Sequence, residues 1–404
     1  MGLAVTQDAK LPIIAFANTG WDALWMNRQH LLSRLAAGGH PVAYSTGTAH
    51  YSEFNELPLL PRFERRGNVV VMRKGYCLPR TDRLSPLARL SMQVHLRYLR
   101  TALGVARGQA CVGMCFDPNL IDFIDMLAPP VRAFHIYDAY NRMTVPVPEF
   151  ADLRRRIERF DMVTASSARM YEDVLGHPPD PRYIIPNGVD YADMLSGMDQ
   201  PCAAADLIRA LPGLRLGYTG TINGKIHLEL VHALACARAD VSVVMVGPVR
   251  HALLDKQAGG LAAYEALRAQ PNVHFIDQVR REDVPAVLNA MDINCLFFRV
   301  DREDWVVAGY PLKLHEYLAI GKPVLSSPII VVLEQFADVV EICDSLEQWL
   351  SAIDRVRREG MRPEQVVARR AVAARNDWNK SAAQMEQLLE QVTRDKLGRT
   401  VARM

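Results

Sequence analysis

The residues whose types and spacing best suit chemistry lie in one segment, residues 310–324, with the sequence YPLKLHEYLAIGKPV. Pro311 suits the first position of a helix, because it lacks an N–H that would stay unpaired there, and Gly321 is a typical helix end. Amides at the beginning of such a helix attract anions. Lys313 and Glu316 are three residues apart, so a helix places them on one face. A cation followed by a carboxylate suits a diphosphate and a ribose diol, but an exposed ion pair between the two side chains explains the spacing equally well.

Two series of alternating strands and helices surround this segment. Apolar runs predict strands at residues 13–16, 42–44, 69–71, 132–137 and 162–165 in the first half, and at residues 214–218, 241–246, 273–276, 293–298 and 323–326 in the second. Helical segments between the strands indicate parallel α/β units. A chain of 404 residues is long enough to require two such domains.

These patterns predict a definite domain organisation. We expect a first domain over residues 1–195, a linker over 196–212 and a second domain over 213–375. A C-terminal helix over 376–404 is expected to pack back on the first domain. The linker is placed where the sequence is rich in Ala and Asp. Ligands of open α/β sheets bind at the carboxyl ends of the strands, so the candidate residues are expected there.

The composition is that of a globular protein, with 50% hydrophobic residues, 23% charged residues and a net charge of +2. No apolar run is long enough to span a membrane, and the N-terminal residues do not resemble a signal peptide. The seven cysteines are scattered and lack the spacing of metal ligands. We therefore expect reduced thiols, a cytoplasmic location and no bound metal.

Four segments in a consistent order carry a resemblance to a known family. Residues 310–324 resemble the donor-binding element of GT-B glycosyltransferases, and residues 186–190 (PNGVD) resemble the linker of these enzymes. Residues 217–221 (GYTGT) resemble the opening of their second Rossmann unit, and residues 16–34 resemble the acceptor-side opening. The chain is similar to the family-4-like enzymes of cell-surface polysaccharide assembly, of the teichuronic-acid and xanthan glucuronosyltransferase types.

The resemblance implies an α/β fold with two Rossmann-like domains whose parallel sheets face a central cleft. It also implies transfer of a sugar from a UDP- or GDP-sugar to a glycan or lipid-linked acceptor in cell-surface polysaccharide or glycoconjugate synthesis, without a cofactor. A sugar-nucleotide epimerase on the same fold and a catalytically silent partner subunit are the alternatives. The sugar, the base, the acceptor and the stereochemical course stay open.

The resemblance assigns a set of residues to the donor. Glu316 is expected to bind the ribose hydroxyls, and Lys313 the diphosphate. The backbone is expected to approach the phosphates or the base at Gly220, Thr221 and Ile222.

Two positions depart from the pattern of the relatives. Many relatives have a glutamate eight residues before the position of Glu316, and here that position is Ala308, so the role of that glutamate is not transferred. Lys225 stands where close relatives often have another residue type. It either adds a phosphate contact or is a solvated loop lysine.

On the acceptor side, Asp138 follows a predicted strand and matches the catalytic aspartate of the xanthan-type enzymes. A carboxylate at a strand end suits a base that takes a proton from an acceptor hydroxyl, although a turn-capping role is the alternative. His135 falls on the opposite face of that strand and is expected to pack inward. Gly20, Trp21 and Arg28 follow the first strand, and Arg28 suits an anionic acceptor.

The segment from residue 62 to residue 107 is strongly basic, with eleven Lys and Arg residues against two acids. Pro86 favours a helix start. Helical geometry places four arginines on one side of this helix: Arg89, Arg97, Arg100 and Arg107. An apolar stripe is predicted from Leu87, Val94, Tyr98, Ala102 and Val105. We expect residues 83–107 to bind an anionic membrane surface, which would make the protein peripherally associated with the inner face of the cell membrane. A solvated arginine face is the alternative, and no nucleic-acid-binding module is recognised.

Overall fold

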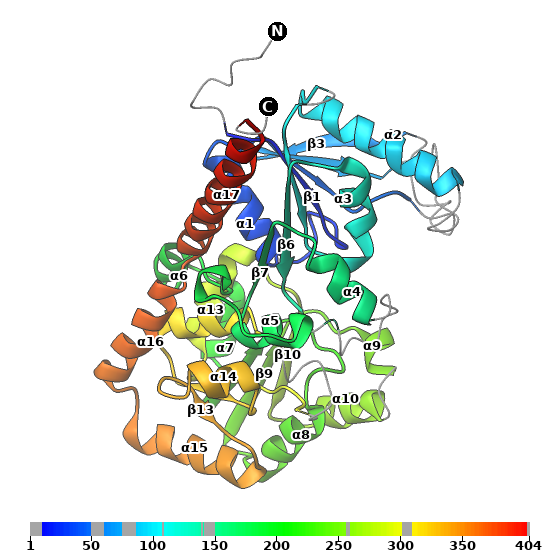
Figure 1. Ribbon diagram of the computed structural model, residues 1–404. Helices are drawn as coiled ribbons and strands as arrows, with labels where there is room; N and C mark the ends of the chain where they lie inside the picture. The colour runs from blue at the N-terminus through cyan, green and yellow to red at the C-terminus, as the bar shows by residue number, and fades with distance from the viewer. Residues whose placement is uncertain are drawn as a thin grey trace. The chain divides into compact units, whose positions relative to one another are not determined.

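The computed structural model describes residues 10–49, 60–74, 86–106, 109–138, 140, 150–255, 259–300 and 309–401. The chain divides into two compact units (Figure 1). Unit 1 comprises Met1–Pro186 together with Trp378–Met404, and unit 2 comprises Asn187–Asp377.

Unit 1 is built on a seven-stranded sheet with the order β3-β4-β2-β1-β5-β6-β7. All neighbouring strands are parallel except β3 and β4. The strands are β1 (Ile13–Phe16), β2 (Val42–Ser45), β3 (Arg62–Arg66), β4 (Val69–Arg73), β5 (Val112–Cys115), β6 (Val131–Ile136) and β7 (Met162–Ala165). The principal helices are α1 (Asn27–Ala37), α2 (Pro86–Ala102), α3 (Ile121–Leu127), α4 (Phe150–Ile157), α5 (Ala168–Leu175) and α17 (Trp378–Val401).

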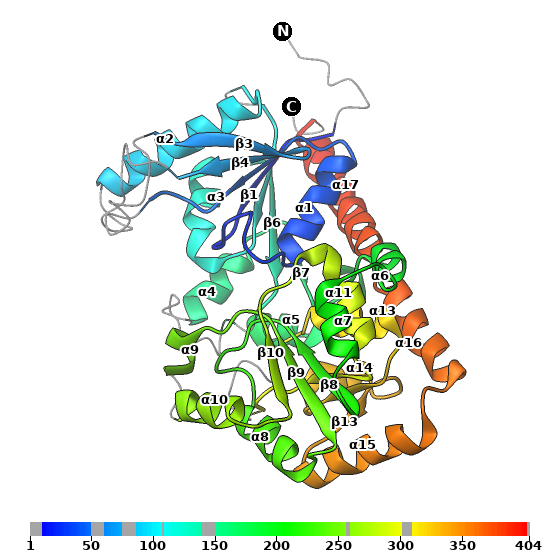
Figure 2. The same cartoon turned by 180° about the vertical axis from the view of Figure 1, so that it is seen from behind.

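Unit 2 is built on a six-stranded sheet with the order β10-β9-β8-β11-β12-β13, and all its neighbouring strands are parallel. Figure 2 shows β10, β9 and β8 side by side. The strands are β8 (Leu214–Thr219), β9 (Val241–Val246), β10 (Val273–Ile276), β11 (Ile293–Leu296), β12 (Val324–Ser326) and β13 (Glu341–Ile342). The helices include α6 (Tyr191–Gly197), α7 (Ala203–Arg209), α8 (Leu228–Ala237), α9 (His251–Asp255), α10 (Gly260–Arg268), α11 (Val284–Ala290), α13 (Lys313–Ile320), α14 (Ile330–Gln335), α15 (Leu346–Glu359) and α16 (Pro363–Arg375).

Each of the ten predicted strands is present, and their sequences explain why. Strands β1, β2 and β9 are buried along their whole length, as expected for parallel strands covered by helices on both faces. Successive strands are added to the second sheet on one side of β8 (β9 and β10) and then on its other side (β11 to β13). The carboxyl ends of β8 and β11 therefore form the topological switch point, where open α/β sheets bind ligands.

The predicted boundary between the domains is wrong in its details. The first unit ends at Pro186 rather than at residue 195, and the expected linker over 196–212 belongs to unit 2. Helix α7 forms inside that segment, since Ala205 and Ile208 are fully buried against α11 and β9. The Ala- and Asp-rich composition that suggested a linker is that of a short amphipathic helix.

The C-terminal segment follows the prediction closely, since the second unit extends to Asp377 and a C-terminal helix packs back on the first unit. Helix α16 packs on α13 in unit 2, and α17 begins at Trp378 and packs on α1, β6 and β7 of unit 1 (Figure 1). The ring of Trp378 stacks on His30, with 4.6 Å between ring centroids. The Ser381 hydroxyl donates to the Pro186 carbonyl at 3.1 Å, which fixes α17 to the last residue of the first segment of unit 1.

Candidate active site

The switch point of unit 2 is occupied by the first turn of α13. The helix begins at Lys313, two residues later than predicted, and Pro311 instead opens the preceding turn, whose carbonyl accepts from the Leu314 amide at 3.2 Å. Gly321 ends the helix at φ +85°, a conformation that favours glycine. The Asn187 side-chain amide donates to the Tyr310 carbonyl at 3.0 Å. The PNGVD segment therefore holds the chain just before α13.

Lys313 is held directly over the end of β8. Its Nζ donates to the Tyr218 hydroxyl at 2.9 Å and lies 4.5 Å from the centroid of the Tyr218 ring. The Phe298 ring contributes a second cation–π contact at 5.4 Å. A Cβ atom at Gly220 would lie 2.6 Å from Nζ, and Gly220 has φ +147°, so only glycine fits there without strain. The Gly220 backbone thus lies against the Lys313 side chain.

The amides of the loop after β8 are largely used within unit 2. The Gly220 N–H donates to the Val246 carbonyl at 2.8 Å, and the Ile222 N–H donates to the Pro248 carbonyl at 3.0 Å. Ile222 is fully buried. The Gly220 and Ile222 amides therefore already donate to backbone carbonyls at the end of β9 and just after it, and the predicted approach of this backbone to the phosphates or the base stays a prediction. Of the three predicted positions, Thr221 is the one whose amide has no acceptor among the described residues.

Glu316 lies one turn further along α13, on the same face as Lys313. Burial raises the pKa of its carboxyl, while the nearby charges of Lys313 and Arg281 oppose this effect. Arg281 itself forms an ion pair with Asp190. A half-buried carboxylate flanked by cations can accept hydrogen bonds from a diol. The structure thus brings Lys313, Glu316 and Gly220 together, as the sequence predicts.

Lys225 lies in the loop that follows Ile222. Its amide donates to the Asn223 side-chain oxygen at 3.0 Å, and its carbonyl accepts from the Arg299 amide at 2.8 Å. These bonds fix the loop backbone against the segment after β11. The phosphate role of the Lys225 side chain stays a prediction, and Ala308 lies outside the described residues.

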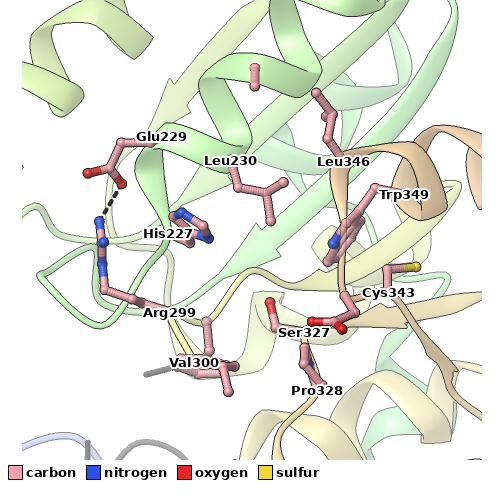
Figure 3. A pocket seen from close by; sticks show the side chains of 13 residues that line it. His227, Glu229, Leu230, Arg299, Val300, Ser327, Pro328, Cys343, Leu346 and Trp349 are labelled. Atoms are coloured by element: carbon pink, nitrogen blue, oxygen red, sulfur yellow. Dashed lines mark hydrogen bonds and ion pairs between the residues drawn. The ribbon is translucent and has the colours of Figure 1, made fainter. Parts of the chain in front are cut away.

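A cavity of about 480 Å³ adjoins this site, within the usual range for ligand pockets (Figure 3). The side chains of His227, Leu230 and Trp349 line its space, and the ion pair between Glu229 and Arg299 borders it. Phe298 lines the cavity and also contacts Lys313, so the cavity and the lysine share this ring. Sequence reasoning missed this cavity, since its walls come from α8, α15 and the ends of β11 and β12.

In unit 1, Asp138 follows β6 at the carboxyl end of the sheet, as predicted, and its carbonyl accepts from the Tyr140 amide at 3.1 Å. His135 points into the interior, as predicted. Its ring nitrogens lie 2.9 Å from the Thr164 hydroxyl and 3.5 Å from both Ser166 Oγ and Asn27 Nδ2. Burial lowers the pKa of His135 to about 3, so this side chain is neutral at physiological pH.

The three residues predicted on the acceptor side differ in exposure. Gly20 is exposed, and no atom lies within 4 Å of a Cβ built there. Trp21 is only 3% exposed and its ring lies edge-on to Tyr44 at 5.0 Å, so its side chain packs in the interior rather than facing an acceptor. Arg28 is also buried, beneath the ring of Tyr137.

The apolar stripe predicted for the basic segment is exposed in part, since Leu87 and Tyr98 are exposed whereas Val105 is buried. The buried stripe of α2 consists of Ala88, Ser91, Met92, His95, Leu96 and Leu99. Leu87, Leu90 and Tyr98, at 41%, 49% and 37% exposure, lie outside this buried stripe and face solvent. Arg89 and Arg97 are exposed beside them.

Several of the counted basic residues do not belong to that surface. Arg100 donates to the Leu127 carbonyl at 3.2 Å and is half-buried, and Arg107 lies outside the described residues. Arg66 and Arg73 are paired with Asp22 and Glu64. No helix of the described residues is long and apolar enough to cross a membrane. Within the described ranges, no group of three His, Cys, Asp or Glu side chains is placed to hold a metal ion.

Residues 213–358, which contain β8 to α15 and the Lys313–Glu316 turn, match the family model described as "Glycosyl transferases group 1". Unit 2 contains a group 1 glycosyltransferase domain. The chain is also 25% identical over 271 residues to a Bacillus subtilis (strain 168) protein named as the teichuronic acid biosynthesis glycosyltransferase TuaH. That alignment covers 65% of this chain and 64% of TuaH, so the likeness spans less than two thirds of the relative.

Solved structures extend the likeness of the glycosyltransferase domain to the whole fold. Anabaena HepE, whose crystal structure contains UDP and glucose, has a TM-score of 0.70 at 12% identity, covering 94% of this chain and 100% of that structure. The trehalose-6-phosphate synthase OtsA has a TM-score of 0.69 at 13% identity, covering 94% and 99%. A trehalose-phosphate synthase from Burkholderia xenovorans has a TM-score of 0.67 at 13% identity, covering 94% and 100%. The predicted fold class, GT-B with two α/β domains, is confirmed.

Proposed function

We propose that the protein is a glycosyltransferase that moves a sugar from a nucleoside-diphosphate donor to a glycan or lipid-linked acceptor. In this proposal unit 2 binds the donor, a UDP- or GDP-sugar, and unit 1 binds the acceptor. The observation that carries it is the first turn of α13, where Lys313 and Glu316 share one face at the switch point of the sheet. The group 1 domain and the relative named for teichuronic acid synthesis support a role in cell-surface polysaccharide synthesis.

The side chains of this turn fit a nucleoside diphosphate. In the proposed complex, Lys313 and the Thr221 amide neutralise the diphosphate that leaves during transfer, so the reaction needs no metal. Glu316 accepts hydrogen bonds from the ribose hydroxyls. Lys225 is the further cation available in the loop after β8.

The donor assignment is tested by titration calorimetry with UDP and GDP. Lys313→Ala and Glu316→Ala should each weaken binding of the preferred nucleotide by about 1–3 kcal/mol, because each removes a charge-assisted hydrogen bond. The matched control is Glu334→Ala, an exposed glutamate on α14 of the same unit. Equal affinities for the wild type and both site variants would refute the donor site.

We propose Asp138 as the base that accepts the proton of the acceptor hydroxyl. Its place after β6, at the carboxyl end of the first sheet, supports this role. Asp138→Asn should lower turnover by about 10²-fold or more and leave nucleotide affinity unchanged. Turnover close to that of the wild type would remove Asp138 from the mechanism.

We propose that unit 1 also attaches the protein peripherally to the inner face of the cell membrane. The exposed surface of α2 supports this, since Leu87, Leu90 and Tyr98 lie among exposed arginines. The exposed Phe63 of β3 lies 6.5 Å from the Tyr98 ring and extends the apolar area. A surface that combines apolar side chains with arginines suits anionic lipids.

A further inference from the structure

Arg28 is a buried cation that the protein itself does not fully satisfy. Its residue is 3% exposed, and its guanidinium donates to the Thr19 hydroxyl and lies 5.4 Å from the centroid of the Tyr137 ring. The buried Nε has no hydrogen-bond acceptor among the described residues. No carboxylate of the described chain lies within ion-pair distance of Arg28. Burying a cation without a counter-charge is costly, so an anion that completes its contacts is favoured.

The position of Arg28 adds a second source of positive potential. Arg28 is the second residue of α1, an eleven-residue helix that begins beyond the loop after β1 and has no acid in its first turn. The amino end of a helix carries a partial positive charge and attracts anions. The carboxyl end of β6, where Asp138 lies, also supplies Tyr137 to this cluster.

The groups around the guanidinium are polar and reach the surface. The exposed Asn18 accepts from the Thr19 hydroxyl at 3.0 Å and from the Tyr137 hydroxyl at 3.5 Å. The Tyr44 hydroxyl donates to the Thr19 carbonyl. The exposed Asn18 therefore connects the cluster around Arg28 to the surface.

Asp117 is an acidic group in this neighbourhood that forms no ion pair with Arg28. The charge of Asp117 raises the pKa of Tyr137, so this carboxylate is in the neighbourhood, while the charge of Arg28 lowers the same pKa. Asp117 accepts from the Asn119 amide at 2.8 Å and begins the short turn after β5. It is not within ion-pair distance of Arg28, so the guanidinium keeps capacity for an external acid.

We infer that Arg28 binds an acidic group of the acceptor, either a carboxylate or a phosphate ester. The inference rests on the proposed function, because it names the chemical class of the acceptor that unit 1 holds. A planar guanidinium suits both groups, since it donates two parallel hydrogen bonds to either. A purely structural role, in which Arg28 only braces Tyr137 and Thr19, is the competing explanation.

The test is a calorimetric titration of the full-length protein with three probes at constant ionic strength: inorganic phosphate, glucuronate and glucose. UDP or GDP is present at saturation, so that the proposed donor site is filled and cannot take up phosphate. The wild type should bind phosphate or glucuronate but not glucose. The tighter of the two anions identifies the acidic group.

Variants of Arg28 distinguish anion binding from a purely structural role of this side chain. Arg28→Gln should lower the affinity for the anion by roughly 10- to 100-fold, as expected for a lost charge-assisted contact. Arg28→Lys should fall between this variant and the wild type, because it keeps the charge without the fork. Arg159→Gln, at an exposed arginine of the same unit, should bind as the wild type does. Unchanged nucleotide affinity in each variant shows that unit 2 is folded.

Two results would overturn the inference. One is a wild type that binds the nucleotide but neither anion, and the other is an Arg28→Gln variant with wild-type anion affinity. Failure of the nucleotide itself to bind counts against the proposed function instead, and the anion titration is then run without it.

Discussion

The backbone of Gly220 packs closely against the side chain of Lys313. The loop after β8 turns at φ +147° and passes beneath the lysine, and the Gly220 carbonyl would meet a Cβ atom at Gly247 at 2.3 Å. Two glycines at neighbouring strand ends therefore allow the loops after β8 and β9 to pack together. This packing fixes the position of Nζ, because the lysine lies on the loop and on the Tyr218 ring.

Gly220→Ala should therefore affect both stability and nucleotide binding. The strained backbone should lower the free energy of unfolding by about 1–3 kcal/mol. The added Cβ should also displace Lys313 and weaken UDP or GDP binding by roughly tenfold. Gly360→Ala is the matched control, since Gly360 has φ +65° but no atom near its Cβ position. It should lose stability only, and an equal loss of nucleotide affinity in both variants would contradict the role given to Gly220.

We expect the buried carboxyl of Glu316 to lower the free energy of unfolding of the ligand-free protein. Burial raises the pKa of its carboxyl, so the folded state binds more protons than the unfolded state over the interval just above the ordinary glutamate pKa. Above the raised pKa, the ionised carboxylate opposes folding. Glu316→Gln should therefore increase the free energy of unfolding of the ligand-free protein at pH 7.5.

That gain should shrink as the pH falls through the raised pKa, and it should vanish below about 4.3, where the carboxyl becomes protonated in both states. Urea denaturation at several pH values measures it, and Glu334→Gln supplies the exposed control. A Glu316→Gln variant that is less stable at pH 7.5 and more stable at low pH would reverse the sign and refute the argument.

The sequence predicted some site residues and not others for identifiable reasons. The pairing of Lys313 with Glu316 depends only on helix periodicity, so spacing is enough to predict it. The use of the Ile222 amide depends on a partner carbonyl in the loop after β9, which no local pattern reveals. The burial of Trp21 and Arg28 depends likewise on Tyr44 and Tyr137, which come from other strands.

At the scale of elements, α2 carries apolar side chains on two faces, and the sequence prediction named only the one that contains the exposed Leu87 and Tyr98. Its sequence contains two apolar stripes, one through Ala88 and Leu99 and the other through Leu87 and Tyr98. The first stripe is buried because α2 packs on α3, whereas the second stays exposed beside Arg89 and Arg97. Periodicity alone does not decide between stripes of similar strength.

The exposed face of α2 predicts a particular response to anionic vesicles. Each basic residue near an anionic surface contributes about 1 kcal/mol, so Arg89→Gln with Arg97→Gln should reduce partitioning by roughly 30-fold at low salt. Leu87→Ser with Leu90→Ser should remove the part of the binding that survives high salt, since salt screens charges but not apolar contacts.

Co-sedimentation at several salt concentrations measures both effects. Arg268→Gln with Arg358→Gln removes the same charge from exposed positions of unit 2 and should change little. A wild type that ignores anionic vesicles at low salt would exclude this surface as a membrane contact.

The strands that sequence analysis missed share a physical reason. Strand β3 is an edge strand with the sequence RFERR, so it lacks an apolar pattern. Strand β13 has two residues, too few for any pattern. Strand β5, with the sequence VGMC, contains a glycine in its interior, where a Cβ atom would lie 2.7 Å from Pro129. Buried strands with uninterrupted apolar runs were all predicted.

At the scale of the whole molecule, each unit is closed by a segment distant in the chain. Helix α17 completes unit 1, and the PNGVD segment lies at the start of unit 2, where Val189 pairs with Asp377 in a β-bridge. The chain crosses from one unit to the other at residues 186–187 and 377–378, and neither crossing has a distinctive composition. Local composition therefore suggested a linker later in the sequence. The number of units was nevertheless predictable from length and from the restart of the strand–helix alternation.

Both units also contain histidines that are buried in the neutral state. Burial lowers the pKa of His95 and His135 in unit 1, and of His315 in unit 2, to about 3 in each case. Each ring accepts or donates within the interior: His95 lies 2.7 Å from the Ser45 hydroxyl, and His315 lies 2.6 Å from the Tyr310 hydroxyl. In the unfolded chain a histidine has a pKa of about 6.5.

The whole protein should therefore lose stability in weak acid, in both units. Between pH 6.5 and 3 these histidines are protonated in the unfolded state but stay neutral in the folded state. The free energy of unfolding therefore falls as the pH decreases. The slope contributed by one such histidine approaches about 1.4 kcal/mol per pH unit. In the interval from pH 6.5 to 5.5 the carboxylates held in ion pairs stay ionised, so measuring the slope in the Glu316→Gln background, which removes the opposing contribution of that carboxyl, isolates the histidine effect.

Urea denaturation across that interval measures the slope. His315→Gln should reduce the slope for unit 2 and leave the slope for unit 1 unchanged. The unfolding of unit 2 is monitored by the fluorescence of Trp349 in a variant that lacks the other tryptophans. His251→Gln, at an exposed histidine of unit 2, should leave the slope as it is in the wild type. A slope that is flat from pH 7 to 5.5, or unaffected by His315→Gln, would mean that the unfolded state does not gain these protons. The neutral histidines would then play no part in the acid sensitivity of the fold.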